Sequence, residues 1–341
     1  VDACQRIIQG EFHDQFVVDM IQGGAGTSTN MNANEVIANV ALESLGYAKG
    51  EYSHLHPNND VNMAQSTNDA YPSALRVGLL LGQPRLLESL EQLCDAFACK
   101  GQAFANVLKM GRTQLQDAVP MTLGQEFNAF ANTLRSELKQ LRQHIPAQLA
   151  EVNIGGTAIG TGINADARYQ QLAVNHLARI SQLPIQAAED LIDSTSDMGA
   201  FISLSSTLKR LAIKLSKVCN DLRLLSSGPR TGLGEINLPA RQPGSSIMPG
   251  KVNPVIPEAV NQVAFEVIGN DAAISFAAEA GQLQLNVMEP LIAYKLFSSI
   301  QLLQRAMDML REQCIEGITA NDERCRQLME SSIGLVTALN R

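Results

Sequence analysis

The chain has 341 residues, a length at which a single hydrophobic core usually gives way to two or more domains. It is 45% hydrophobic but only 4% aromatic and has no tryptophan, a composition that favours long aliphatic helices over sheet sandwiches. The net charge of −8 and the absence of a basic stretch argue against nucleic acid as a partner. No apolar run approaches the ~20 residues that cross a bilayer, so we expect no membrane partner.

The six cysteines form no CxxC pair and no metal-ligand grouping. This pattern is typical of free thiols in a reducing compartment. No signal-peptide pattern is visible either, and we therefore expect a cytoplasmic protein.

The spacing of apolar residues predicts five long helices. In chain order they cover about 71–108 with an interruption at Gly82–Pro84, 122–145, 204–226, 257–279, and 283–316 with a bend near Pro290. The second opens on a capping box formed by Thr122 and Gln125, and its apolar stripe comprises Phe127, Phe130, Leu134, Leu138 and Leu141. The third is the clearest, because its apolar residues step by four and three alternately, as in a bundle helix. That seam comprises Leu204, Leu208, Leu211, Leu215, Val218, Leu222 and Leu225. We therefore expect a mainly α fold with a long central helical bundle.

The first of four polar loops is Gly23–Asn32, followed by Asn34 and Glu35. Its glycines permit close backbone approach to a ligand, and its hydroxyls and amides can bind oxyanions. It is not a P-loop, because no Gly-Lys-Ser/Thr follows, and no strand–GxGxxG–helix pattern marks a dinucleotide site. An ordinary turn with an Asn or Thr helix cap stays open as an equal alternative.

The second loop runs from His56 to Asp69 and includes Ser66, Thr67 and Asn68 just before a helix. These residue types at a helix start are first of all N-caps. The free N–H groups of the same helix start also make it a ready site for a carboxylate.

The third loop is Gly111–Asp117, and its simplest interpretation is a polar turn in which Arg112 and Asp117 pair. The fourth is Gly244–Pro254, which combines flexible glycines, two adjacent hydroxyls, a lysine and an asparagine ahead of a helix. A loop of this composition is what a lid that supplies a reactive group needs. A disordered linker is the alternative, but linkers rarely carry Met-Pro and Lys-Val-Asn-Pro at fixed offsets.

These four loops together resemble the fumarase/aspartase superfamily over essentially the whole chain. The fourth resembles its signature G-S-S-x-M-P-x-K-x-N, and the others match its remaining blocks in the same order. The forms Gly24–Ser28, Gln65–Asn68 and Gly111–Gln114 look like the aspartase branch, since fumarases typically show SGTQ, QSSN and GRTH there. Gln114 replaces the superfamily's common histidine, which argues against a His-mediated proton relay.

The resemblance implies an enzyme that removes ammonia from L-aspartate by reversible anti elimination, through an aci-carboxylate, to give fumarate. It implies that Ser245 is the catalytic base and that Glu258 supports it. The substrate-binding residues that it implies are Thr27, Ser66, Thr67 and Ser246 for the β-carboxylate, Lys251, Asn253 and Thr113 for the α-carboxylate, and Asn68 and Gln114 for the amino group. A secondary dicarboxylate region is assigned to His56, Pro57, Asn58 and Asn59.

The resemblance also implies three domains: the remainder of an N-terminal domain at 1–66, a central long-helix domain at 67–321, and the start of a C-terminal domain at 322–341. Family members carry further N- and C-terminal segments, which we expect to be largely absent here. A homotetramer with sites shared between subunits is implied as well. Apolar and alanine-rich faces of the helices at 204–226 and 257–280 would supply its contacts, although a buried central helix in a monomer would look the same.

This chemistry requires no cofactor, and although some aspartases respond to magnesium, the sequence shows no ligand set for it. Two alternatives stay open. A class II fumarate hydratase shares nearly every loop, and a catalytically inert structural homologue would use the same bundle, as lens crystallins related to this superfamily do.

Overall fold

The computed structural model describes residues 1–244, 247–248 and 251–334, which are mainly helical, as predicted. The described chain divides into two compact units. Unit 1 comprises Val1–Gly82, His144–Ser205 and Asn270–Ser298, and unit 2 comprises Gln83–Gln143, Ser206–Gly269 and the chain from Ser299 onward. These units interleave along the sequence, so they differ in kind from the three consecutive domains expected above, which stay a prediction.

The helices are α1 (Asp2–Ile8), α2 (Thr27–Ser44), α3 (Thr67–Ala103), α4 (Leu123–Gln143), α5 (Ile145–Leu149), α6 (Tyr169–Ser181), α7 (Leu191–Ser196), α8 (Gly199–Leu225), α9 (Val255–Glu279), α10 (Glu289–Gln313) and α11 (Asp322–Glu330). Single turns lie at His13–Gln15, Pro57–Val61 and Ile315–Gly317. Three two-stranded sheets complete the described structure: antiparallel β1 (Leu108–Thr113) and β2 (Gln116–Thr122), parallel β3 (Glu151–Val152) and β4 (Gln186–Ala187), and antiparallel β5 (Ile236–Asn237) and β6 (Thr319–Ala320).

The predicted capping box at the start of α4 is confirmed. The backbone N–H of Thr122 donates to Gln125 Oε1 at 2.9 Å, and the N–H of Gln125 donates to Thr122 Oγ1 at 3.1 Å. Every apolar residue predicted for the α4 stripe and for the α8 seam is buried. Periodicity therefore located these two helices and their buried faces.

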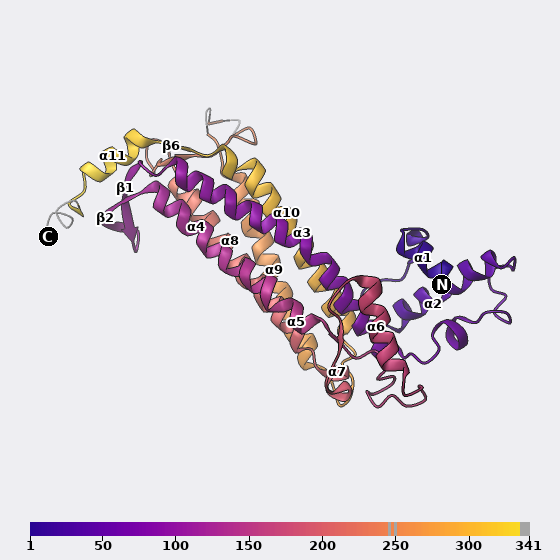
Figure 1. The fold of residues 1–341 in the computed structure, drawn as a ribbon. Coiled ribbons are helices and arrows are strands. Elements are labelled where there is room, and N and C mark those ends of the chain that lie inside the picture. The colour runs from indigo at the N-terminus through magenta and orange to yellow at the C-terminus, as the bar shows by residue number, and fades with distance from the viewer. Residues whose placement is uncertain (245–246, 249–250, 335–341) are drawn as a thin grey trace. The chain divides into compact units, whose positions relative to one another are not determined.

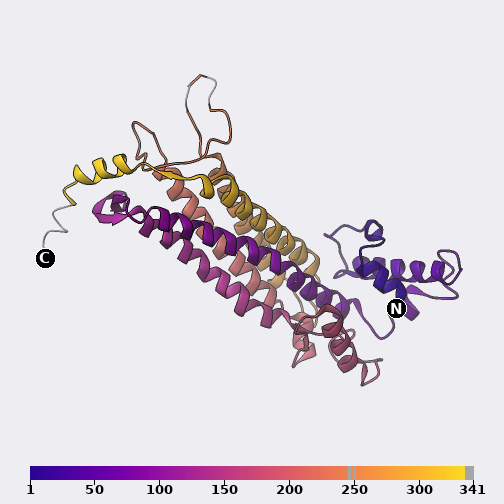
Figure 2. The ribbon, with the colours of Figure 1, turned by 45° about the horizontal axis from the view of Figure 1, so that its top comes forward.

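Within unit 2, α4 lies beside α8, and α8 lies beside α9, in both views of the ribbon (Figures 1 and 2). Glu137 of α4 is buried and accepts hydrogen bonds from Arg210 at 2.9 Å and Lys214 at 2.5 Å, both of α8. The amide of Asn261 on α9 donates to the Ser216 carbonyl of α8 at 3.1 Å. Polar side chains thus fix the helix pairing that the apolar seams favour.

Two predictions about prolines in the helices were wrong. Helix α3 continues through Gly82–Pro84 instead of breaking there, because Leu79 and Leu86 on either side are fully buried and outweigh one missing backbone hydrogen bond. Instead of bending at Pro290, α10 begins at Glu289, which places the proline in the first turn, where its missing N–H has no partner to lose.

The turn before α10 is held by Asn286. Its amide donates to the Ala277 and Ala278 carbonyls near the end of α9, and its Oδ1 accepts from the N–H of Met288. This asparagine therefore closes one helix and leads into the next.

Among the described residues, no helix combines the length and the apolar character that a membrane crossing requires.

Candidate active site

The start of α3 in unit 1 is a capped helix N-terminus, as the composition of the second polar loop predicts. Ser66 Oγ accepts from the N–H of Asn68 at 3.2 Å, and the N–H of Ser66 donates to Asp69 Oδ1 at 3.0 Å. Ser66, Thr67 and Asn68 are each partly exposed. Their hydroxyl, amide and backbone N–H groups therefore surround the positive end of a helix dipole, which suits an anion.

Asp69 fixes this helix start to the loop at residues 153–160, which also belongs to unit 1. Its carboxylate is fully buried, and Oδ2 accepts hydrogen bonds from the N–H groups of Gly155 at 3.1 Å and Thr157 at 2.8 Å. Burial raises the pKa of the Asp69 carboxyl, and the hydrogen bonds that it accepts from backbone N–H groups oppose that rise. Asn68 reaches the same loop, because its amide donates to the Ala158 carbonyl at 2.8 Å.

The sequence analysis missed the loop at residues 153–160, which contains Gly155 and Thr157. Its signal was the glycine spacing, since Gly155 and Gly160 have φ of +91° and +92°. A Cβ atom at Gly155 would meet Gln170, and one at Gly160 would collide with the Ile192 backbone. The loop therefore passes too close to α6 and α7 for side chains, and its shape is set by those contacts.

The start of α2 lies against the start of α3 within unit 1. Asn30 of α2 donates to Thr67 Oγ1 at 3.0 Å, and a Cβ atom added to Gly26 would lie 2.6 Å from the Tyr71 ring. Thr27, directly after Gly26, donates its hydroxyl to the Gly24 carbonyl at 2.6 Å. Unit 1 therefore brings the segment of Thr27 to that of Ser66, Thr67 and Asn68.

His56 caps the single turn Pro57–Val61. Its Nδ1 accepts from the N–H groups of Asn58 at 3.1 Å and Asn59 at 3.2 Å, while its own N–H donates to Asp60 at 2.6 Å. The tautomer with the proton on Nε2 follows from these two accepted bonds. The assignment of His56–Asn59 to a secondary dicarboxylate region stays a prediction.

In unit 2, Thr113 and Gln114 lie at the tip of the β1–β2 hairpin. Thr113 pairs with Gln116, so Gln114 and Leu115 form the two-residue turn, with φ of +53° and +62°. Both backbone angles lie in the left-handed region that such hairpin turns require and that side chains disfavour. All three side chains are exposed.

A group of charged side chains surrounds β1 before the hairpin tip. Lys109 is 2% exposed and lies 2.6 Å from Glu126 and 2.8 Å from Glu235, and Arg112 lies 2.8 Å from Glu235. The predicted partner of Arg112, Asp117, is 3.9 Å away and more than half exposed, which makes it the weaker contact. A cavity of about 290 Å³ is lined by Gln114 together with Lys109, Arg112, Glu126, Lys217 and Asp221.

The fourth polar loop is described only in part, since Ser245 and Ser246 lie outside the described residues. A Cβ atom at Gly244 would collide with the carbonyl of Lys251, so the two backbones touch at the base of the loop and only glycine fits. The backbone carbonyl of Asn253 accepts from the N–H of Val255 at 2.9 Å, and Glu258 lies in the first turn of α9. The loop therefore ends directly at a helix start.

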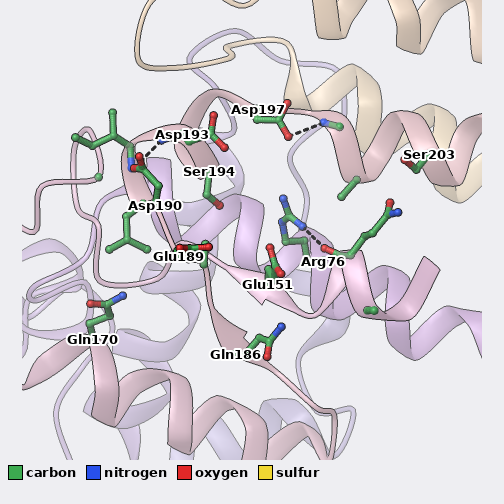
Figure 3. A pocket seen from close by; sticks show the side chains of 18 residues that line it. Arg76, Glu151, Gln170, Gln186, Glu189, Asp190, Asp193, Ser194, Asp197 and Ser203 are labelled. Carbon is green, nitrogen blue, oxygen red and sulfur yellow. Dashed lines mark hydrogen bonds between the residues drawn. The ribbon is translucent and has the colours of Figure 1, made fainter. Parts of the chain in front are cut away.

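A cavity of about 1190 Å³ in unit 1 is lined by none of the predicted site residues (Figure 3). Its carboxylates include Glu151 and Glu189, and several others cap helices. Asp190 accepts from the N–H of Ile192 at 2.9 Å, and Asp197 accepts from the N–H of Gly199 at 3.0 Å. This acidic lining would repel a dicarboxylate substrate, so the cavity is no candidate for its binding.

Comparison with known proteins assigns the family. The model of a family described as lyase matches residues 1–269. An aspartate ammonia-lyase from Pseudomonas aeruginosa is 76% identical over 339 residues, covering 99% of this chain and 72% of the relative.

Two solved structures share the fold. One, titled fumarate lyase:delta crystallin from Brucella melitensis bound to cobalt, has a TM-score of 0.97 at 60% identity and covers 99% of this chain and 74% of its own. A class II fumarase from Schistosoma mansoni has a TM-score of 0.94 at 35% identity, with the same two coverages. The chain therefore belongs to this lyase family, in the aspartate ammonia-lyase branch of the fumarase/aspartase superfamily.

Proposed function

We propose that the protein is an ammonia-lyase that removes ammonia from L-aspartate to give fumarate. The observation that carries this is the 76% identity to an aspartate ammonia-lyase over 99% of the chain. Incubation of the purified full-length protein with L-aspartate should release fumarate and ammonia in equal amounts. Release of neither product would refute the proposal.

The difficulty of the reaction is the C3 proton of aspartate, which is very weakly acidic. Its removal creates a doubly charged aci-carboxylate on the β-carboxylate, and preorganised hydrogen-bond donors stabilise such charge best. Thr27, Ser66 and Thr67 would supply donors, together with Ser246. Their proximity to two helix starts within unit 1 supports this role, because the helix N–H groups add to the positive potential.

Further predicted residues would bind the other groups of the substrate. Lys251, Asn253 and Thr113 would hold the α-carboxylate, and Asn68 and Gln114 would contact the amino group. Exposure of Thr113, Gln114 and Lys251 supports these roles, since a substrate must reach their side chains.

Ser245 would act as the base. A serine hydroxyl is far too weak an acid to ionise unaided, so its oxyanion needs loop N–H groups and the ammonium of Lys251 nearby. The contact between the Gly244 and Lys251 backbones supports this, because it keeps the two ends of the loop together. Glu258, in the first turn of α9, would play a supporting part.

We further propose a homotetramer of D₂ symmetry in the cytoplasm, in which each site takes the Ser66, Thr113 and Ser245 segments from three different chains. Exposed aromatic rings on α9 support an interface there, since Phe265 is 61% exposed and Phe276 75%.

No cofactor is required by the chemistry. For magnesium, the described residues contain no group of three or more His, Cys, Asp or Glu side chains arranged to hold a metal ion.

Fumarate hydratase is the second candidate, favoured by the TM-score of 0.94 to a class II fumarase. The same fold would then add water to fumarate, and L-malate would replace L-aspartate as the substrate. Turnover of these two substrates separates the candidates.

A further inference from the structure

Glu235, in the segment between α8 and β5, has no exposed side-chain surface and faces two cations of the same strand. Its Oε1 lies 2.8 Å from Arg112 Nη1 and its Oε2 lies 2.8 Å from Lys109 Nζ. Lys109 is shared with Glu126 on α4. The buried Lys109 and the partly exposed Arg112 are thus neutralised by two carboxylates, and loss of Glu235 would leave Lys109 with less compensation in the interior.

A β-bulge in β2 lies next to both cations. In a regular strand, residues three apart such as Lys109 and Arg112 point to opposite faces. Both side chains nevertheless reach Glu235, next to a register shift at which Met110 pairs with Pro120 and Arg112 pairs with Asp117, so that β2 holds the extra residue. Gly111 permits this, because a Cβ atom there would lie 2.9 Å from the Val119 carbonyl.

The backbone of Glu235 is itself anchored within unit 2. Its N–H donates to the Leu225 carbonyl at the end of α8, and its carbonyl accepts from the N–H of Asn321, both at 2.9 Å. Ile236, the next residue, pairs with Ala320 in the β5–β6 sheet. The carboxylate therefore presents a fixed point against which β1 is held.

We propose that Glu235 is a positioning residue that sets where the hairpin tip presents Thr113 and Gln114. This rests on the proposed function, in which those two side chains bind the α-carboxylate and the amino group of aspartate. Arg112 is the direct neighbour of Thr113, so a shift of its guanidinium moves the tip. Glu235 touches no substrate in this account and acts only through Lys109 and Arg112.

Glu137 provides a matched control. It is equally buried in unit 2 and also faces two cations, Arg210 and Lys214, but it joins α4 to α8 and touches no part of the hairpin. Glu137→Gln and Glu235→Gln each remove one charge from a fully buried carboxylate, although the cations that face Glu137 are the more exposed pair. A purely structural role for Glu235 would make the two variants behave alike.

The experiment measures melting temperature, steady-state kinetics with L-aspartate, and hydrogen exchange of the hairpin amides in both variants. Both should melt earlier. Only Glu235→Gln should raise KM for aspartate, by about tenfold, and should add little to the KM of Thr113→Val in the double variant, because both changes act on the same contact. Only Glu235→Gln should speed exchange at residues 108–122.

The proposal is overturned if Glu235→Gln changes KM no more than Glu137→Gln does, or if its effect multiplies in full with that of Thr113→Val. Should Glu235→Gln fail to fold, Arg112→Gln tests the same link from the more accessible side and should raise KM likewise. A wild-type protein without activity on aspartate would refute the proposed function instead. Hydrogen exchange would then still decide whether Glu235 holds the hairpin.

Discussion

The backbone N–H of Thr157 donates a 2.8 Å hydrogen bond to the buried carboxylate of Asp69, across 88 residues of sequence. Through this bond and that from Gly155, the helix start that carries Ser66, Thr67 and Asn68 is fixed to the glycine loop at 153–160. The residues proposed to donate hydrogen bonds to the aci-carboxylate are therefore held in place by a neighbouring loop. Such support restricts their motion before substrate arrives.

Replacing Asp69 with alanine should lower the free energy of unfolding by roughly 3 kcal/mol, because buried N–H groups lose their acceptor. It should also lower kcat/KM by about 10–100-fold as the donors shift. Urea unfolding and aspartate kinetics measure the two effects. Asp190→Ala is the control, since Asp190 also accepts two backbone N–H groups but caps the exposed start of α7. Equal losses of activity in both variants would contradict the positioning role of Asp69.

Ser245→Ala should lower kcat by about 10²–10⁴-fold and leave KM for aspartate nearly unchanged. A general base acts in the transition state and adds little to ground-state binding. Steady-state kinetics and circular dichroism of the variant provide the test. Retention of more than about a tenth of the wild-type kcat would exclude Ser245 as the base.

Glu289 should make stability depend on pH. Its side chain is 1% exposed, and burial raises its pKa from 4.5 to about 8, against the opposing charge of Arg76. Because the folded state holds this proton more tightly than the unfolded chain, wild-type stability falls as pH rises from about 4.5 to 8. Glu289→Gln, which stays neutral, should match the wild type near pH 5 and exceed its stability near pH 9.

Melting temperatures of wild type and Glu289→Gln across this range measure the effect. Glu189→Gln, at an exposed carboxylate, controls for the general response to charge removal. A difference between Glu289→Gln and wild type that is constant with pH would show that Glu289 has no raised pKa.

Subunit mixing should test the shared sites of the proposed tetramer. Ser245→Ala subunits, and Thr113→Val subunits assayed at an aspartate concentration far below their raised KM, should each be nearly inactive alone. Together, after unfolding and reassembly, they should recover part of the activity. Recovery follows because some composite sites then receive both intact segments. If native mass spectrometry shows mixed tetramers and activity stays absent, the two residues serve a site from the same chain.

The sequence predicted what local periodicity encodes. The α4 stripe, its capping box and the α8 seam are confirmed, because 3.6-residue spacing and cap chemistry act within one helix. The interruption at Gly82–Pro84 was wrong, since burial on both sides overrides the local preference of proline.

The supporting contacts of the site could not be predicted. Glu235 and Arg112 are 123 residues apart, and nothing near either one indicates the other as a partner. The β1–β2 hairpin was missed because its turn, Gln114-Leu115, has none of the Asn-Gly or Asp-Gly composition that marks such turns. The roles proposed for the site residues came from the resemblance to a family, because the periodicity of apolar residues predicts helices and their buried faces but no catalytic role.

The most direct test of the proposed function compares L-aspartate with L-malate as substrates of one purified preparation, with fumarate followed by its ultraviolet absorbance. Ser245→Ala serves as the blank for contaminating activity. We predict that kcat/KM for aspartate exceeds that for malate by at least about a thousandfold, because an uncharged hydroxyl offers one donor where the ammonium offers three and so leaves acceptors of the site unpaired. Comparable turnover of the two substrates, or turnover of malate alone, would contradict an aspartate ammonia-lyase and assign the protein to the fumarases.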